Sequence, residues 1–371
     1  MLTQDPNAYK LLTPGPLTTT LTVREKMLVD RCTWDDDYKS MTEAVRAGLL
    51  KLAQVSADEY TTVLMQGSGT FGVESVLSSL PSATDSVLVL VNGAYSERMC
   101  KILDRHRVNY SRLDFPWNEI PDAAAVAAFL KEHPETTHVS MVHSETTTGL
   151  LNDVEAVSRV VKAAGRIMIV DAMSSFAGVE IPVKAWGIDV IVSSANKCIQ
   201  GAPGFCFVIA KRSVLEASRG NARTLSLDLY DQWKTFEADR GKWRFTSPTH
   251  TVAAFAQAMK ELEEEGGIAA RSARYRALNA RLREGMERLG FRAYIAPDHQ
   301  GPIITTFFYP SEGFSFRDMY DELKREGYVI YPGKLTDQET FRLGNIGDLS
   351  MSDVERILDL FERIVRRRRA A

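Results

Sequence analysis

The nine residues SSANKCIQG, at positions 193–201, decide the fold, because they place a lysine where packing alone would not. They follow the apolar run 187–192 and precede a second apolar run at 205–210, and both runs have the composition of buried strands. Lys197 is therefore expected in a loop of small residues between two buried strands. A lysine in such a place needs a path to solvent or a partner of opposite charge.

An aspartate supplies the candidate partner. The apolar run 166–170 reads as another buried strand, and it ends on Asp171. In an open α/β sheet, ligands bind in the crevice at the carboxyl ends of the strands. Pyridoxal phosphate chemistry uses such a pair: the amine forms a Schiff base with the cofactor aldehyde, and the carboxylate pairs with the pyridinium nitrogen. The pair alone leaves a plainer alternative open, in which Lys197 is a surface lysine in a turn and Asp171 caps a helix.

A phosphate site is predicted at the loop GSGT, residues 67–70. It follows the strand-like run 60–66 and opens a helix expected at 71–80. Glycines and hydroxyl residues at a helix N-terminus present N–H and O–H groups to an anion, and the helix dipole helps. Gly72 completes the spacing of a dinucleotide fingerprint, but the next strand ends in Asn92 and not in the acid that this fingerprint requires. We therefore expect a monophosphate here.

Other strand ends carry side chains that suit a planar, anionic ligand. Tyr95 follows one strand and either stacks on a cofactor ring or packs at the rim. The run 137–142 is followed by HSETTTG at 143–149, a cluster of hydroxyl groups. Arg342, on an apolar strand that ends in glycine and asparagine, is expected to bind an anion. The loop TPGPL at 13–17 is either a plain turn or a rigid loop whose backbone approaches a ligand.

Composition excludes several classes of protein. The chain has 371 residues, of which 44% are hydrophobic and 25% are charged. Its net charge of −3 does not provide the excess of positive charge that is typical of nucleic-acid-binding proteins. The basic run 366–369 closes a helix expected at 352–365 and is interpreted as a solvated tail. No apolar run approaches the roughly 20 residues of a membrane span, and no signal peptide is evident. The cysteines at 32, 100, 198 and 206 show no metal-binding spacing and are expected to be reduced, in the cytoplasm.

The order of strands and helices indicates how the chain is divided. Their alternation up to about residue 210 predicts an α/β fold with a mostly parallel sheet, and residues 221–249 are expected to be rich in loops. The second half predicts helices at 250–265, 268–289 and 316–326, and strands at 291–296, 303–309 and 328–331. We expect an N-terminal arm (1–20), a large cofactor-binding domain (21–267) and a smaller C-terminal α+β domain (268–371).

Over nearly its whole length the chain resembles the class V branch of the fold-type I pyridoxal-phosphate enzymes. The order and spacing of Asp171, Lys197 and Arg342 are specific for that superfamily. The segments that carry the resemblance are LTPGPL (12–17), WDDDY (34–38), GSGT (67–70), HSETTTG (143–149), SSANKC (193–198) and FRLGNIG (341–347). The WDDD and SSANKC segments indicate the aminotransferases of this branch that act on phosphonates.

The resemblance implies a fold and a set of roles. The fold would have a large, mostly parallel sheet of the seven-stranded type and a smaller C-terminal domain, in a homodimer with active sites at the interface. Lys197 would carry the Schiff base and Asp171 would pair with the pyridinium. The cofactor, pyridoxal 5′-phosphate, would further contact Ser68, Gly69 and Thr70 at its phosphate, Tyr95 on its ring, Thr146 near the ring hydroxyl, Asn196, and Thr246 of the other subunit. Two positions depart from the pattern, because relatives often have tryptophan for Tyr95 and glutamine or histidine for Asn196.

The implied reaction moves the amino group of 2-aminoethylphosphonate to pyruvate, giving 2-phosphonoacetaldehyde and alanine. Arg342 would bind the substrate anion, with help from Gly15, Pro16 and Leu17. An alanine–glyoxylate or serine–pyruvate aminotransferase would share every cofactor residue, so amino-donor preference alone separates it. A lyase or cysteine desulfurase needs a nucleophilic cysteine in the C-terminal half, and the last cysteine is Cys206. A binding protein without activity would be expected to have lost Lys197 or Asp171.

Overall fold

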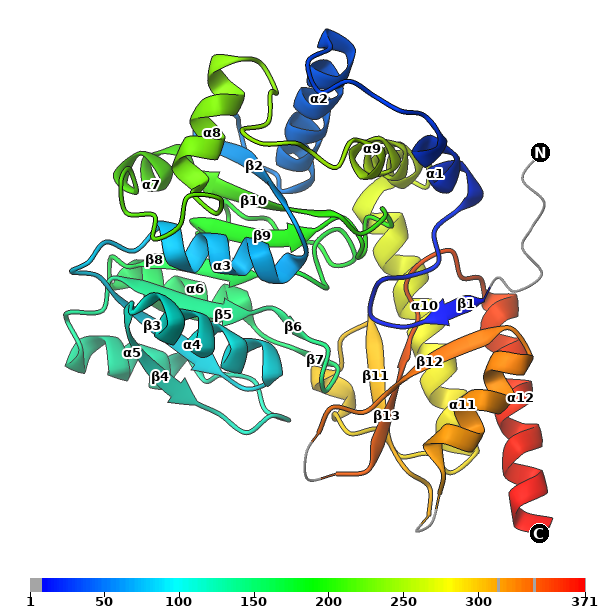
Figure 1. Ribbon diagram of the computed structural model, residues 1–371. Coiled ribbons are helices and arrows are strands. Elements are labelled where there is room, and N and C mark those ends of the chain that lie inside the picture. The colour runs from blue at the N-terminus through cyan, green and yellow to red at the C-terminus, as the bar shows by residue number, and fades with distance from the viewer. Residues whose placement is uncertain (1–8, 312–313, 336–337, 371) are drawn as a thin grey trace.

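The structure is a computed structural model that describes residues 9–311, 314–335 and 338–370 (Figure 1). Its described part contains a larger and a smaller β-sheet, a two-stranded sheet of β6 (Ser144–Glu145) and β7 (Leu150–Leu151), and the surrounding helices. Residues 1–8 of the expected arm lie outside the described residues, as do the side chains at 368 and 369 of the basic run. In the described part of the chain, no helix combines the length and the apolar character that spanning a bilayer requires.

The larger sheet confirms the α/β class. Within the described residues it has seven strands in the order β2-β10-β9-β8-β5-β3-β4. Neighbouring strands are parallel except at β10, which is antiparallel to β2 and β9. The strands are β2 (Tyr60–Gln66), β3 (Ser86–Val91), β4 (Asn109–Asp114), β5 (His138–Val142), β8 (Ile167–Asp171), β9 (Val190–Ser194) and β10 (Phe205–Lys211). The predicted mostly parallel sheet is therefore correct.

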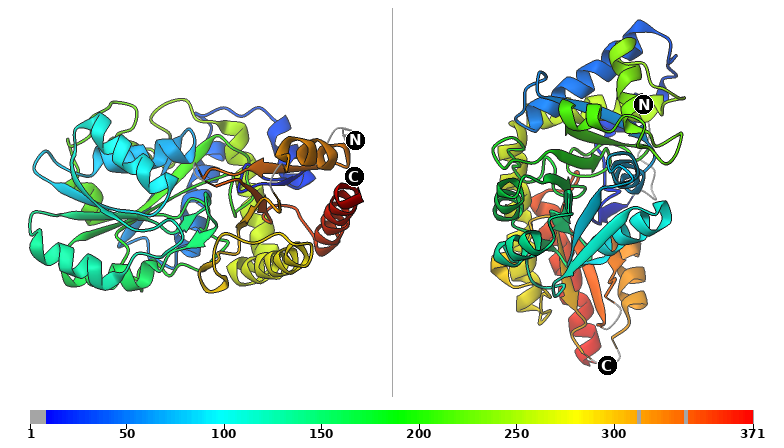
Figure 2. Two further views of the ribbon diagram at one scale, coloured as in Figure 1. Left: turned by 90° about the horizontal axis from the view of Figure 1, so that it is seen from below. Right: turned by 90° about the vertical axis from the view of Figure 1, so that its left-hand side faces the viewer.

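Helices on both faces explain why these strands are continuous apolar runs (Figure 2). A strand covered on both faces has no solvent side, so alternation of polar and apolar residues disappears. In β3, for example, every residue from Val87 to Val91 is at most 1% exposed. The helices of this part of the chain are α1 (Leu21–Glu25), α2 (Asp36–Leu52), α3 (Gly69–Ser79), α4 (Ala94–His106), α5 (Ala123–Glu132), α6 (Val154–Ala163), α7 (Arg212–Ala217), α8 (Leu229–Ala238) and α9 (Thr249–Glu264).

The smaller sheet has four strands in the described part of the chain, in the order β1-β12-β13-β11. They are β1 (Lys10–Leu12), β11 (Ile304–Phe308), β12 (Tyr328–Pro332) and β13 (Thr340–Gly344), and α10 (Gly267–Arg288), α11 (Phe316–Arg325) and α12 (Met351–Ala370) accompany them. Strand β1 pairs in parallel with β12. Residues 10–12 of the expected N-terminal arm thus form one strand of the sheet that carries Arg342.

One local prediction is incomplete and another is wrong. Residues 221–249 are rich in loops, as expected, but they also contain helix α8, because the carboxylate of Asp228 caps the helix N-terminus and three side chains at helical spacing, Leu229, Trp233 and Phe236, are buried. The expected strand at 291–296 forms only an isolated bridge between Ala293 and Phe307, and the proline that follows it at 297 cannot extend a ladder.

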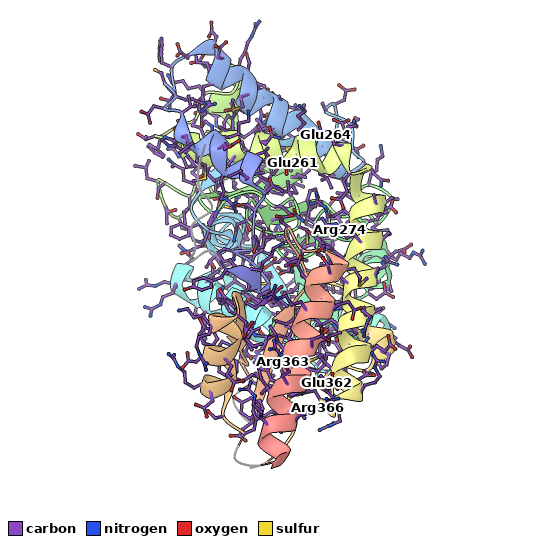
Figure 3. All side chains as sticks on the ribbon, turned by 90° about the vertical axis from the view of Figure 1, so that its right-hand side faces the viewer. Glu261, Glu264, Arg274, Glu362, Arg363 and Arg366 are labelled. Carbon is purple, nitrogen blue, oxygen red and sulfur yellow. The ribbon has the colours of Figure 1, made fainter. Side chains whose placement is uncertain are left out.

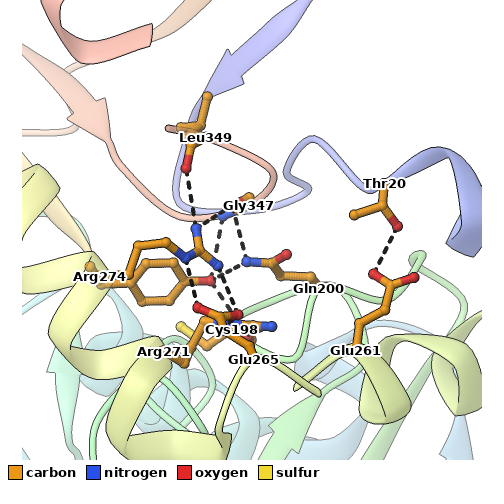
Figure 4. Close-up of polar contacts among 10 residues, drawn as sticks. Thr20, Cys198, Gln200, Glu261, Glu265, Arg271, Arg274, Gly347 and Leu349 are labelled. Atoms are coloured by element: carbon orange, nitrogen blue, oxygen red, sulfur yellow. Dashed lines mark hydrogen bonds and ion pairs between the residues drawn. The ribbon is translucent and has the colours of Figure 1, made fainter. Parts of the chain in front are cut away.

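An ion-paired group where α9 ends and α10 begins, which we call the α10 cluster, consists of Glu265, the C-cap residue of α9, and of Arg271 and Arg274 on α10 (Figure 4; Figure 3 shows the place of Arg274). Glu265 accepts from Arg271 Nε at 2.5 Å and from Arg274 Nε at 2.7 Å. Arg271 Nη1 donates to the carbonyl of Cys198 at 2.6 Å, and Arg274 Nη1 donates to that of Gly347 at 3.0 Å. The cluster therefore ties the loop after β9 to the loop after β13, which are the two segments that follow Lys197 and Arg342.

Candidate active site

A cavity of about 610 Å³ opens where β8 and β9 end and α3 begins. Because these parallel strands are neighbours, their carboxyl ends deliver Asp171 and the Lys197 loop to the same edge of the sheet. The sequence-predicted residues that line the cavity are Gly15, Pro16, Ser68, Gly69, Thr70, Tyr95, Asp171, Asn196, Lys197 and Arg342. Segments far apart in the sequence thus converge on one site.

Lys197 is half-buried and faces the N-terminal loop. Its ammonium donates to the carbonyls of Pro14 and Gly15, each at 2.9 Å. Gly15 has φ +102°, and a Cβ there would lie 2.6 Å from Lys197 Cδ, so the loop closes on the lysine only with glycine. Burial lowers the pKa of Lys197 to about 8. An amine that loses its proton near neutral pH is prepared to act as a nucleophile and as a base.

Asp171 ends β8 and is 5% exposed. Its Oδ1 accepts from the backbone N–H of Met173 at 2.8 Å. Burial raises the pKa of Asp171 to about 6, while the nearby charges of Arg98 and Lys197 act in the opposite direction. A buried carboxylate without an ion-pair partner among the described residues is suited to receive a cationic group from a ligand.

The loop 67–70 forms an anion cradle at the N-terminus of α3. Ser68 is the N-cap residue, but its side chain makes no capping hydrogen bond, and the first turn carries no acidic residue. A Cβ on Gly69 would collide with the Met173 side chain, so the start of α3 packs closely against Met173. The N–H groups in the first turn of a helix have no partner within the helix and can bind an anion. Arg98 Nη1 donates to the Thr70 hydroxyl at 3.1 Å, which leaves the Thr70 O–H to donate to a ligand.

Arg342 lies on β13 and is 3% exposed. Its Nε donates to the carbonyl of Pro332 at 3.0 Å and its Nη1 to that of Thr146 at 3.1 Å. Among the described residues it forms no ion pair with a carboxylate. These carbonyls hold the guanidinium in place at the cavity wall and leave its charge for an anion.

Three predicted residues do not line the cavity. Thr146 is buried behind it, where its hydroxyl donates to the Tyr95 hydroxyl at 3.2 Å. Leu17 packs in a small apolar group with Cys198, Tyr275 and neighbours. Thr246 is exposed on this chain, away from the lining residues. The structure therefore places Thr146 and Leu17 in supporting positions and leaves Thr246 outside this cavity.

Sequence reasoning missed several residues of the site. Arg98, Met173, Tyr331 and Lys334 also line the cavity. Arg98 lies one helical turn after Tyr95 on α4, and its guanidinium is 5.0 Å from the Tyr95 ring centroid, so helical spacing could have indicated it. Lys334 lies between β12 and β13, and no local pattern in the sequence places it near Tyr95.

Glu145 holds the first turn of α4, which carries Tyr95. Its carboxylate accepts the N–H groups of Tyr95 at 3.1 Å and Thr147 at 3.0 Å. A Cβ on Gly93 would collide with this carboxylate. Burial raises the pKa of Glu145 to about 7. The group fixes the backbone that presents the Tyr95 ring.

The residues present fit pyridoxal 5′-phosphate as a group. A half-buried amine, a buried carboxylate, an aromatic ring and a helix N-terminus free of acidic residues match its aldehyde, ring nitrogen, ring face and phosphate. Cys198 and Cys206 do not offer an alternative nucleophile, because burial raises the pKa of each thiol to about 12.

The fold and this site are those of an aminotransferase. A solved structure of an aspartate aminotransferase of subgroup IV from Thermus thermophilus superposes with a TM-score of 0.86 at 25% identity, over 96% of this chain and 99% of that one. The family model for aminotransferase class-V matches residues 33–346, and the chain belongs to this family.

Similar curated proteins carry a more specific name. A protein of Lysinibacillus sphaericus (strain C3-41), named 2-aminoethylphosphonate–pyruvate transaminase, is 54% identical over 95% of this chain and 96% of its own length. A protein of the same name from Phocaeicola vulgatus is 49% identical over 96% of this chain and 99% of its own.

Proposed function

We propose that this protein is a pyridoxal-phosphate-dependent aminotransferase that transfers the amino group of 2-aminoethylphosphonate to pyruvate, giving 2-phosphonoacetaldehyde and alanine. One observation carries the proposal: a single cavity joins Lys197, Asp171, the 67–70 cradle and the buried, unpaired Arg342. The names of relatives about half identical over nearly the full chain support the choice of substrates.

Each residue of the cavity is assigned a separate role in the reaction. When bound, the cofactor supplies an electron sink for the carbon next to the amino group. Lys197 Nζ, partly neutral because its pKa is about 8, holds the cofactor and moves a proton between the two reacting carbons. Asp171 holds the proton on the ring nitrogen. The residues that would hold the remaining groups are Ser68, Gly69, Thr70, Tyr95, Asn196 and, from the other subunit, Thr246.

Arg342 serves both substrates. The anion of alanine is attached to the carbon that bears the nitrogen, whereas the phosphonate lies one carbon further away. A planar guanidinium pairs with carboxylate or phosphonate oxygens alike. Arg342 is fixed by two carbonyls and not by a carboxylate, so either anion meets an uncompensated charge. In the Gly15–Leu17 segment only the Gly15 N–H would add a backbone donor, because Pro16 has no N–H and Leu17 does not line the cavity.

We also propose a homodimer in the cytoplasm. Trp34 is 68% exposed and Leu225 is 74% exposed, and Phe245 beside Thr246 is exposed as well; large apolar side chains on a surface favour an interface. The four cysteines are free thiols, which favours a reducing compartment. The test is complementation: Lys197→Ala and Thr246→Val chains, each inactive alone, should regain activity when mixed into hybrid dimers. A fully active monomer would contradict this proposal.

The decisive experiment for the reaction is a panel of amino donors. With pyruvate as the acceptor, kcat/KM is measured for 2-aminoethylphosphonate, serine and aspartate, and for alanine with glyoxylate. We expect the aminophosphonate to exceed every other donor. If serine or alanine exceeds it, the enzyme is instead a serine–pyruvate or alanine–glyoxylate aminotransferase.

A further inference from the structure

The cavity carries more positive charge than the roles above use. Four cationic side chains line it, those of Arg98, Lys197, Lys334 and Arg342, against the carboxylate of Asp171. None of the four forms an ion pair with a carboxylate within the described ranges. Elsewhere several half-exposed lysines are paired, as Lys234 is with Glu216 at 2.5 Å. Unpaired cations gathered in one cavity indicate anionic ligands.

Three of the four cations already have partners. Arg98 donates to Thr70 in the phosphate cradle, Lys197 donates to the carbonyls of Pro14 and Gly15, and Arg342 is fixed on β13. The ammonium of Lys334 makes no hydrogen bond to any described residue, and it lies over the Tyr95 ring, 5.1 Å from the centroid. Among the four cations that line the cavity, it is the one without a hydrogen-bond acceptor in the described part of the chain.

The position of Lys334 suits a larger anion than a carboxylate. Arg342 is deep in the wall at 3% exposure, whereas Lys334 is exposed at the rim and reaches over Tyr95 from the chain between β12 and β13. A phosphonate group lies one carbon further from the amine than the carboxylate of alanine does. It also has a third oxygen and, once fully ionised, a second charge, which one guanidinium does not neutralise.

We propose that Lys334 is a specificity-determining residue that binds the phosphonate together with Arg342 and favours a dianionic donor over a monocarboxylate. The inference rests on the proposed function, because it assigns the substrate anion to the same cavity. The charge of Lys334 also acts on Lys197, since Lys334 and Arg342 both help to lower the pKa of that amine. A bound phosphonate that neutralises the charge of Lys334 would therefore also raise the pKa of the Lys197 amine.

The test measures binding of two unreactive anions to the holoenzyme by calorimetry at low salt. Ethylphosphonate and propionate differ in charge and in oxygen count but share the alkyl chain. Lys334→Met should weaken the binding of ethylphosphonate roughly 10-fold, which is the value of one hydrogen bond to a charged group. The affinity for propionate should stay within about twofold of the wild-type value. Lys334→Arg should retain most of the ethylphosphonate affinity. In turnover, Lys334→Met should raise KM for 2-aminoethylphosphonate with little change in kcat.

Another lysine that lies over an aromatic ring provides a matched control. Lys324, on α11, covers the ring of Tyr9 at 5.3 Å from its centroid, outside the cavity. Lys324→Met removes the same charge and the same kind of ring contact, and it should change neither affinity. Equal losses of both anions in Lys334→Met, or an unchanged ethylphosphonate affinity, would overturn the inference. The proposed function fails separately, if the wild-type enzyme does not prefer 2-aminoethylphosphonate in the donor panel.

Discussion

Two regions of this protein each contain a buried arginine, but only one of the two arginines has a carboxylate partner among the described residues. In the α10 cluster, Arg271 is 2% exposed and its guanidinium meets Glu265 at 2.5 Å. In the cavity, Arg342 is 3% exposed, and no carboxylate among the described residues pairs with it. Both regions are close to the loops that follow Lys197 and Arg342, so location does not explain the difference.

The difference distinguishes cations that stabilise the fold through ion pairs from cations that remain unpaired until a ligand binds. Burying an unpaired charge is costly, so a fold keeps one only where another molecule supplies the partner. The same contrast appears among lysines. Lys162 pairs with Asp189 at 2.5 Å, whereas Lys197 has only carbonyl acceptors. Removing an unpaired cation should therefore impair function and spare stability, and breaking a paired one should do the reverse.

The largest expected effect is that of Lys197→Met on turnover. Loss of the amine removes both the attachment of the cofactor and the proton transfer, so kcat/KM for 2-aminoethylphosphonate should fall roughly 1,000-fold or more. Steady-state kinetics measure this, and the far-ultraviolet circular dichroism spectrum should not change. A variant with near wild-type turnover would assign the amine to another residue.

Asp171→Asn should have the next largest effect. The amide keeps the shape but does not hold a proton on the ring nitrogen by charge, and we expect at least about a 100-fold loss of kcat, the value of one strong electrostatic group. Asp153→Asn is the matched control, because Asp153 only caps α6 and asparagine caps equally well. Activity of Asp171→Asn within a few-fold of wild type would show that the ring nitrogen has another partner.

Glu265→Gln should affect stability instead. It leaves Arg271 buried without its carboxylate and weakens the hold of Arg274, so unfolding free energy should fall by roughly 3 kcal/mol. Urea denaturation of the cofactor-free protein measures this. Glu261→Gln is the control, because Glu261 lies one turn earlier on α9 and accepts from Thr20 and Thr22 without an ion pair. Equal losses in the two variants would remove the distinction between the two regions.

The fold was predictable wherever a local pattern determines structure. The bounds of β2 agree with the strand predicted at 60–66 to the residue, because it is a run of buried residues. Strand β4 was not predicted, since NYSRLD at the sheet edge is half-exposed and carries no apolar signal. The domain limits at residues 20 and 267 and the role of Thr246 stay predictions.

The site was predictable where functional residues follow strands in sequence. Asp171 and Lys197 end or follow neighbouring strands, so chain order alone placed them together. Lys334 was missed because its distance to Tyr95 depends on how the two sheets are arranged, which no local pattern encodes. Arg98 was missed although helical spacing from Tyr95 indicated it.

The smallest expected effect is on stability. Lys197→Met should be more stable than wild type, by an amount that depends on pH. In the cofactor-free protein the pKa of Lys197 falls from 10.5 to about 8, so folding disfavours the charged amine. Below pH 8 both states are charged and the full penalty applies. Between pH 8 and 10.5 the folded amine is neutral while the unfolded one keeps its proton, so the penalty fades as pH rises and is gone above 10.5.

Lys197→Met should accordingly be more stable than wild type by roughly 2 kcal/mol at pH 7, since a pKa change of one is worth about 1.4 kcal/mol and the amine is only half-buried. Urea denaturation from pH 7 to 10 should show the two curves converging above pH 8. Lys162→Met is the paired counterpart. Because it deprives Asp189, which is 3% exposed, of one cation, it should destabilise the protein at pH 7. If both lysine variants shift stability in the same direction at pH 7, pairing does not distinguish the two classes of buried cation.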